Sequence, residues 1–285
     1  MISTGLLKPT VACVCFALAL TVARGAMGAG EVDHSPYDAL LKKHSRNGLV
    51  DYGAMKKDLP GLDAYLKTLS DSSAVHYATW SRDTRLAFWI NAYNALAIYA
   101  VATDYPIRAG EPASKQKFPE GSIGRIEDVW NTAYFDLAGK PVSLDEIHNG
   151  ILRKQFGDPR IHFALVRASR GSPLLSDEAY RAEVLDEQLE RDAVRFVNDY
   201  DKVRVNITRG RLHVSEIFDW YAADFVLEGD EIPEWLTAYR KKTRGFVSFI
   251  AERVDRQTRE AIEKRGLKVD YLKYDWSLND LPADE

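Results

Sequence analysis

The spacing of apolar residues along the chain predicts helices with one buried face. Apolar side chains recur every three or four residues in Tyr37–Lys43, in Leu62–Leu69 and from Leu185 to Tyr200, which is the period of an α-helix. A Ser-x-x-Glu capping box at Ser143 begins a helix that we expect to run to about Lys154. Three further helices are predicted over Ser215–Phe225, Pro233–Thr243 and Phe246–Arg265.

Other segments have the features of short strands. Gly48–Tyr52 and Arg160–Val166 are short, mainly apolar runs, and we expect the second to be a largely buried strand. Glycines between two apolar runs predict hairpins over Tyr134–Val142 and Val203–Val214. A last strand is predicted over Val269–Trp276.

The segment Leu86–Ala102 is the least polar helix of the chain, since only Asn91 and Asn94 are strongly polar among its seventeen residues. A helix that is apolar on all sides is either buried or membrane-spanning. The two amides and the short length favour a buried central helix. Because helices and short strands follow one another without a regular βαβ repeat, the predicted fold class is α+β. We expect a single mixed domain over residues 32–285, with short antiparallel strands and helices surrounding the central helix.

The N-terminal segment has the pattern of an export signal. Lys8 is followed by an uncharged run of fifteen residues, Pro9–Ala23, and then by small residues that allow cleavage after Gly25 or Gly28. This run is shorter than the roughly 20 residues that span a bilayer, which argues against the alternative of a retained anchor helix. We therefore expect a secretory signal peptide over residues 1–28, a secreted or periplasmic location, and no stable membrane span after cleavage.

Composition narrows the classes of function that the chain can serve. It is 46% hydrophobic, enough for a sizeable core, and its 38 basic and 42 acidic residues give a net charge of −4. Because an acidic protein attracts polyanions poorly, we expect no nucleic-acid partner. The two cysteines, Cys13 and Cys15, both lie in the expected signal. The mature chain would then contain neither a disulfide nor a thiol nucleophile.

Common cofactor and metal motifs are missing from the sequence. It contains no G-x-x-x-x-G-K-[ST], no G-x-G-x-x-G and no H-E-x-x-H, and no two of its six histidines lie within five residues of each other. We therefore predict no cofactor and no metal site. His148, His162 and His213 could still meet in space, but a structural role explains each of them more simply.

Six longer phrases occur together in the sequence. They are RLAFWINAYNAL from Arg85, SLDEIHNGILR from Ser143, DPRIHFALV from Asp158, ASRGSPL from Ala168, SEIFDWYAADF from Ser215 and YDWSLN from Tyr274. Through these phrases the chain from about Val50 to Asn279 resembles the family called domain of unknown function 547 (DUF547), which is found in secreted bacterial proteins and, behind coiled coils, in plant proteins. The resemblance implies a mixed α+β domain with a remote likeness to papain- or transglutaminase-type thiol enzymes.

Two positions depart from the pattern of many bacterial members of that family. Where those members carry a cysteine before a proline, this chain has Ser172 before Pro173, and where many carry another cysteine it has Arg167. If the family cysteine before proline is a nucleophile, a hydroxyl here replaces a thiol. The resemblance therefore makes Ser172 a candidate catalytic residue for hydrolase or acyl-transfer chemistry.

Ser172 lies in a loop that we expect to join the strand Arg160–Val166 to a helix beginning near Ser176. A serine nucleophile needs a base within hydrogen-bond reach, and His148 and His162 are the candidates for that base. The alternative is a turn serine whose hydroxyl only satisfies nearby backbone groups.

The remaining candidate residues concern binding. Asn91 and Asn94 share one face of the central helix, where they either pin nearby loops or line a polar pocket. Ser169, in the loop, and Arg85, at the start of the central helix, complete the residues that we place at a site for a small-molecule or peptide ligand. Two functions follow as hypotheses: a hydrolase or acyl-transfer enzyme built on Ser172, and a non-catalytic secreted binding or scaffold domain.

Overall fold

Helices make up most of the fold, and the strands form three small sheets. The computed structural model describes residues 31–72, 74–108, 117–132, 135–137, 140–227 and 231–281. The N-terminal half contains α1 (Ser35–His44), β1 (Ser45–Arg46), β2 (Leu49–Val50), α2 (Tyr52–Lys57), α3 (Leu59–Ser70), α4 (Ala74–Thr79), α5 (Arg82–Asp104), β3 (Phe135–Leu137) and β4 (Lys140–Val142). The C-terminal half contains α6 (Arg153–Phe156), α7 (Ile161–Ala164), α8 (Leu185–Val197), β5 (Val203–Asn206), β6 (Arg211–Ser215), α9 (Ile217–Trp220), α10 (Arg244–Ala251), α11 (Arg256–Arg265) and β7 (Lys268–Leu272). Short 3₁₀ or π-helical segments join them: η2 (Ile123–Arg125), the π-helical η3 (Glu146–Leu152), η4 (Ala182–Val184), η5 (Ala222–Asp224), η6 (Glu234–Ala238) and η7 (Lys241–Thr243).

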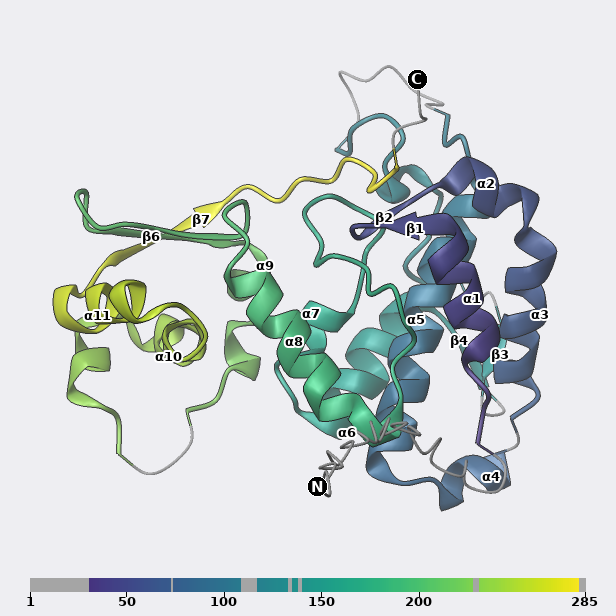
Figure 1. Cartoon of the computed structure of the whole chain (residues 1–285), viewed down its shortest axis with the longest axis horizontal. Helices are drawn as coiled ribbons and strands as arrows, with labels where there is room; N and C mark the ends of the chain where they lie inside the picture. The colour runs from purple at the N-terminus through teal and green to yellow at the C-terminus, as the bar shows by residue number, and fades with distance from the viewer. Residues whose placement is uncertain are drawn as a thin grey trace, which may run out of the picture.

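Two hydrophobic cores share helix α8. Helices α1 to α5 lie around one core, and β6 and β7 lie with α10 and α11 around the other, on the left of the view (Figure 1). Leu185 and Leu189 of α8 belong to the first core, whereas Phe196 and Val197 belong to the second. The predicted α+β class is confirmed. The expected signal peptide and its cysteines fall outside the described residues.

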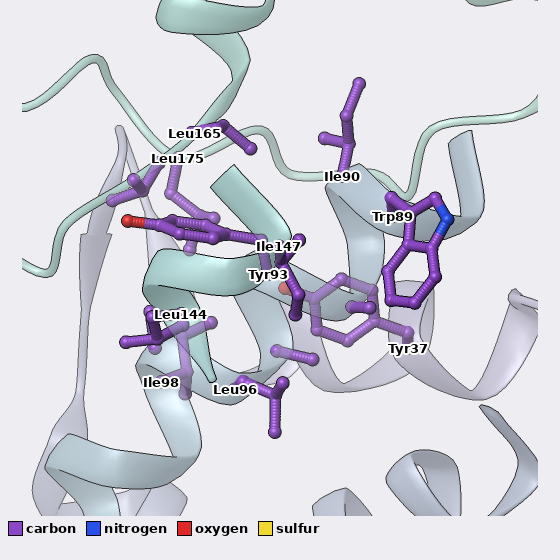
Figure 2. Close-up of a cluster of buried hydrophobic side chains, with 14 of the residues drawn as sticks. Tyr37, Trp89, Ile90, Tyr93, Leu96, Ile98, Leu144, Ile147, Leu165 and Leu175 are labelled. Atoms are coloured by element: carbon purple, nitrogen blue, oxygen red, sulfur yellow. The ribbon is translucent and has the colours of Figure 1, made fainter. Parts of the chain in front are cut away.

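Helix α5 forms the centre of the first core, as predicted for the apolar segment. Every residue from Leu86 to Ile98 is buried. Figure 2 shows Trp89 and Tyr93 of this helix in one cluster with Leu144 and Ile147. Among the described helices, α5 is the one that is long and apolar enough to cross a bilayer, but 89% of its most apolar window is buried inside the protein. That burial is what a core helix requires.

The three sheets are built mainly from hairpins. β1 pairs with β2, β3 with β4 and β5 with β6, all in antiparallel register. The hairpins predicted over Tyr134–Val142 and Val203–Val214 are therefore confirmed, although the turn residues Ala138 and Gly139 lie outside the described part. The strand predicted over Gly48–Tyr52 shrinks to the two residues of β2. β7 runs parallel to β6, so the antiparallel expectation is wrong for this strand. A long, mainly helical connection lies between the two strands, as a parallel pair requires.

The buried strand predicted over Arg160–Val166 is wrong, because the segment forms the short helix α7. An apolar run of this length fits a buried helix as well as a strand, so its tertiary contacts decide. Asn94 ends the helix: its Nδ2 donates to Ala164 O and its Oδ1 accepts from Val166 N, each at 2.9 Å. The chain after α7 is therefore extended.

Other predicted helices differ in extent. The helix expected over Phe246–Arg265 is divided into α10 and α11, because Asp255 caps a new helix through two following backbone amides. Pro233–Thr243 forms the 3₁₀ turns η6 and η7, and Ser215–Phe225 holds only α9 and η5. The helix expected near Ser176 is absent there, and the first helical turn after that residue is η4.

The two amides of α5 pin the chain that follows α7. Asn91 Nδ2 donates to Tyr180 O (2.9 Å), and its Oδ1 accepts from Tyr180 N (2.8 Å). Asn94 makes the equivalent pair with Ala164 and Val166. Both amides are buried, so these bonds are shielded from water. Of the two roles expected for these amides, pinning nearby loops and lining a polar pocket, these hydrogen bonds correspond to the first.

Replacing Asn94 with alanine should test this role. The substitution leaves Ala164 O and Val166 N buried without partners, at about 1–3 kcal/mol each, so we expect the free energy of unfolding in urea to fall by about 2–5 kcal/mol. Asn131→Ala, which removes an exposed amide bonded to Asp128, is the control and should change it by less than about 0.5 kcal/mol. Equal losses in the two variants would contradict the role.

Candidate functional site

The loop Leu165–Leu175 lies against the C-terminal segment Tyr274–Asn279. Gly171 N donates to Asp275 O (2.7 Å), and a Cβ on Gly171 would lie 2.8 Å from that backbone, so only glycine permits the approach. Ala168 has a φ of +47°, in the left-handed region that a residue with a side chain rarely adopts. Backbone strain of this kind is frequent at functional sites.

Ser172, the predicted nucleophile, is buried in this loop. Its Oγ accepts a hydrogen bond from Arg167 N (2.9 Å) and lies close to Ser169 Oγ (2.9 Å) and Tyr274 Oη (2.8 Å). Ser169 Oγ is itself 2.7 Å from Tyr274 Oη, so the three hydroxyls form a closed triangle. Neither histidine predicted as a base is among the hydrogen-bond partners of Ser172. A catalytic role for this serine stays a prediction.

The two histidines contact each other and extend into a longer chain. His148 Nε2 lies 3.4 Å from His162 Nδ1, and His162 Nε2 lies 2.8 Å from Asp224 Oδ2. At the other end, Arg167 Nη2 donates to His148 Nδ1 at 3.2 Å. Both imidazoles are buried. The order of the chain is Arg167, His148, His162, Asp224.

The chemistry of the two ends sets the direction of these hydrogen bonds. A guanidinium can only donate, so His148 Nδ1 accepts and the proton of that ring lies on Nε2. This N–H donates to His162 Nδ1, and His162 therefore carries its proton on Nε2 and donates it to the Asp224 carboxylate. Both imidazoles are neutral, and all four ring nitrogens are engaged.

Burial and neighbouring charges favour these protonation states. Burial lowers the pKa of His148 well below its ordinary value of 6.5, and the Arg167 cation lowers it further. Burial also lowers the pKa of His162, although Asp224 opposes this. Burial opposes ionisation of Asp224, but hydrogen bonds from His162 and from Arg153 Nε (2.6 Å) and Nη2 (2.8 Å) hold its pKa well below the usual range.

A pocket of about 280 Å³ opens beside His148 and Arg167. Half of its ten lining residues are tyrosines and tryptophans: Tyr93, Trp130, Trp220, Tyr221 and Trp276. The Arg167 guanidinium lies over the rings of Trp220 (5.6 Å) and Tyr221 (5.4 Å). His148 reaches the pocket from η3, and a π-helical segment of this kind is common at functional sites. Asp145, which is exposed, completes the charged lining.

Arg167 keeps its charge at this pocket. Burial would lower the pKa of its guanidinium, but the surrounding hydroxyls of Tyr93, Tyr221 and Tyr274 hold that pKa above its ordinary value. Its hydrogen bonds go to the neutral side chains of His148 and Tyr221. Within the described part of the chain, no carboxylate lies in ion-pairing distance of Arg167.

The other residues predicted for binding lie elsewhere. Asn91 and Asn94 bond to backbone groups, Ser169 belongs to the hydroxyl triangle, and Arg85 lies over the ring of Tyr77 (5.9 Å). None of the four is among the residues that line this pocket. Across the described ranges, no group of three or more His, Cys, Asp or Glu side chains could hold a metal ion.

Sequence reasoning missed most of the pocket. In the sequence, the departure from the family pattern at Arg167 was the one signal that pointed to this residue. Asp224 is 62 positions from His162, and no local spacing connects the two residues. Tryptophans are more often core residues than part of a binding site, so the sequence alone did not place Trp220 and Trp276 in a pocket wall.

Comparison with known proteins gives one match. The family model described as a protein of unknown function, DUF547, matches residues 77–197 and supports the assignment to that family. The matched range includes α5, η3, α7 and the loop with Arg167 and Ser172. The phrases from Ser215 and from Tyr274 lie outside it. No curated protein and no solved structure matches the chain.

The neutral histidines should make stability depend on pH. Since the pKa of His148 and of His162 is lower in the folded protein than in the unfolded chain, the unfolded chain binds more protons below about pH 6.5. We therefore expect the free energy of unfolding to fall between pH 7 and pH 5, and to fall less in His148→Gln. An unchanged slope in that variant would contradict the assignment. Long-range ¹H–¹⁵N NMR spectra at pH 6 should show both rings neutral with the proton on Nε2.

Replacing Gly171 should weaken the packing of the loop against the C-terminal segment. In Gly171→Ala the new Cβ meets the Asp275 backbone at 2.8 Å, so we expect a loss of about 1–3 kcal/mol in unfolding free energy and a change in tryptophan fluorescence as Trp276 shifts. Gly53→Ala, within α2, is the matched control, because a Cβ there makes only ordinary van der Waals contacts, at 3.5 Å with Asp51 and 3.7 Å with Tyr105. Equal stability of the two variants would show that the loop does not need this close approach.

Proposed function

The chain carries a DUF547 domain over residues 77–197, and we propose that this protein binds a small molecule with an anionic group and a flat body. The observation that carries this proposal is the Arg167 guanidinium, which lines an aromatic pocket and makes its hydrogen bonds to neutral groups. We also propose that it acts after export, which rests on the N-terminal pattern alone.

The charge of Arg167 supports an anionic ligand. A cation held partly out of water without a counter-ion is costly, and a bound carboxylate or phosphate removes much of that cost. Arginine is suited to this task because its planar fork donates two parallel hydrogen bonds to such groups. Asp224, the acid at the far end of the histidine chain, is separated from Arg167 by two neutral rings.

The walls of the pocket support a flat body. Trp130, Trp220 and Trp276 line the pocket, and the Arg167 guanidinium lies over the ring of Trp220. Rings of this kind stack on planar or sugar-like groups, and pockets with apolar walls and one convergent charge are typical of small-molecule sites. Asp145 at the rim adds a negative charge that weakens anion binding.

The hydrolase hypothesis has less support from this geometry. A general base needs a free lone pair, and the ring nitrogens of His148 and His162 are all engaged in hydrogen bonds. The hydroxyl of Ser172 is bonded to Arg167 N and lies within the triangle with Ser169 and Tyr274. Binding therefore describes the pocket better than catalysis does.

Benzoate and its neutral isostere benzamide should separate the two ligand classes. We expect benzoate to change the tryptophan fluorescence on binding and benzamide to bind at least about tenfold more weakly, since a charge-assisted hydrogen bond contributes about 1.5–3 kcal/mol. Arg167→Gln should lose the preference for benzoate, while Asp145→Asn should strengthen benzoate binding. Equal binding of both compounds, or a preference that survives Arg167→Gln, would refute the proposal.

A covalent probe tests the competing function. Under our proposal a fluorophosphonate does not label Ser172. Labelling of Ser172 that depends on His148 or His162 would favour the hydrolase instead.

A further inference from the structure

A second cavity of about 520 Å³ also has Trp276 in its wall. The residues that line it come from two segments, 117–120 and 273–276, together with Arg125. Trp276 lines both cavities, with Trp220 at 6.1 Å on the side of the first and Phe118 at 5.0 Å on the side of the second. The two cavities are therefore neighbours that share one aromatic wall.

Arg125 is the unusual residue of the second cavity. Its Nε donates to Phe118 O (3.0 Å), but both terminal guanidinium nitrogens are buried without a hydrogen-bond partner. Buried donors in proteins are nearly always paired, because each unpaired one carries a free-energy penalty. In the described part of the chain no carboxylate forms an ion pair with Arg125. The guanidinium therefore has unused capacity to donate to an anion.

The other charges of this cavity are on its surface. Lys117 and Lys273 are exposed cations, and Glu120 and Asp275 are exposed acids. Asp275 Oδ1 already accepts from Ser277 N (2.9 Å) and Ser277 Oγ (2.6 Å). Glu120 is thus the acid that most directly competes with an incoming anion.

We infer that the ligand carries two anionic groups, one bound by Arg167 and the other by Arg125, with its body lying along Trp276. This inference rests on the proposed function, since it takes the first anionic site from it. Two guanidinium groups in cavities that share one indole fit a dicarboxylate or a related dianion. Once the first group is bound, the second binds at a high effective concentration, so the two sites strengthen each other.

Linear α,ω-dicarboxylates from succinate to sebacate test this inference, each compared with the monocarboxylate of equal chain length. At one chain length we expect the dicarboxylate to bind at least about tenfold more tightly than its monocarboxylate. Arg125→Gln should abolish this advantage and leave benzoate binding unchanged. Lys264→Gln, an exposed site on α11 that removes the same charge, should leave the advantage intact.

Two further variants keep the test decisive if Arg125→Gln fails to fold. Arg125→Lys retains a cation without the planar fork, and we expect it to keep part of the advantage. Glu120→Gln changes only an exposed acid, and we expect it to increase the advantage.

The outcomes separate the two proposals. Benzoate binding that depends on Arg167, with no dicarboxylate advantage at any chain length, overturns the two-anion inference and leaves the proposed function standing. An advantage that survives Arg125→Gln also overturns the inference. Failure of benzoate to bind overturns the proposed function itself.

Discussion

The hydrogen bonds of one buried amide fix the point at which the chain leaves α7 and leads to Arg167 of the pocket. Asn94 can satisfy a carbonyl and an N–H at once, and it does so for Ala164 and Val166, two residues apart on another segment. A short helix therefore ends at this point, and the chain leaves it in an extended conformation. Arg167 is the next residue, so its direction is determined by a polar contact inside an apolar core. Because both partners are buried, water cannot replace that contact.

The hydrogen-bonded chain beside the pocket separates two opposite charges, Arg167 and Asp224, instead of pairing them. Arg167 and Asp224 stand at the two ends of a chain whose middle members, His148 and His162, are neutral. Asp224 is satisfied locally by Arg153, which lies in a forked geometry on its two oxygens. The guanidinium at the other end has only dipoles as partners. The same hydrogen bonds that hold the histidines in place thus leave a cation facing the cavity, which is the physical basis of the proposed anion binding.

The pocket could not be read from local patterns, because distant segments build it. Tyr93 comes from α5, His148 from η3, Trp220 from α9 and Trp276 from the segment after β7. Gly171 lets that last segment approach the loop. Ser172 was the candidate that the family resemblance suggested. Its hydroxyl, however, is used to hold the loop to Tyr274.

The sequence by itself determined the α+β class, the buried central helix and the hairpins, because each of these depends on hydrophobic periodicity and turn residues within one short segment. It also shows that both cysteines lie within the first fifteen residues and that the common cofactor motifs are missing. Only the tertiary structure decided that Arg160–Val166 is helical, since the amide that ends α7 comes from another helix. It alone brought Asp224 to His162 and Arg167 to His148, because hydrogen bonds between residues far apart in sequence have no local signal. For the same reason, no local pattern marks Arg167 as a cation that has no carboxylate partner among the described residues.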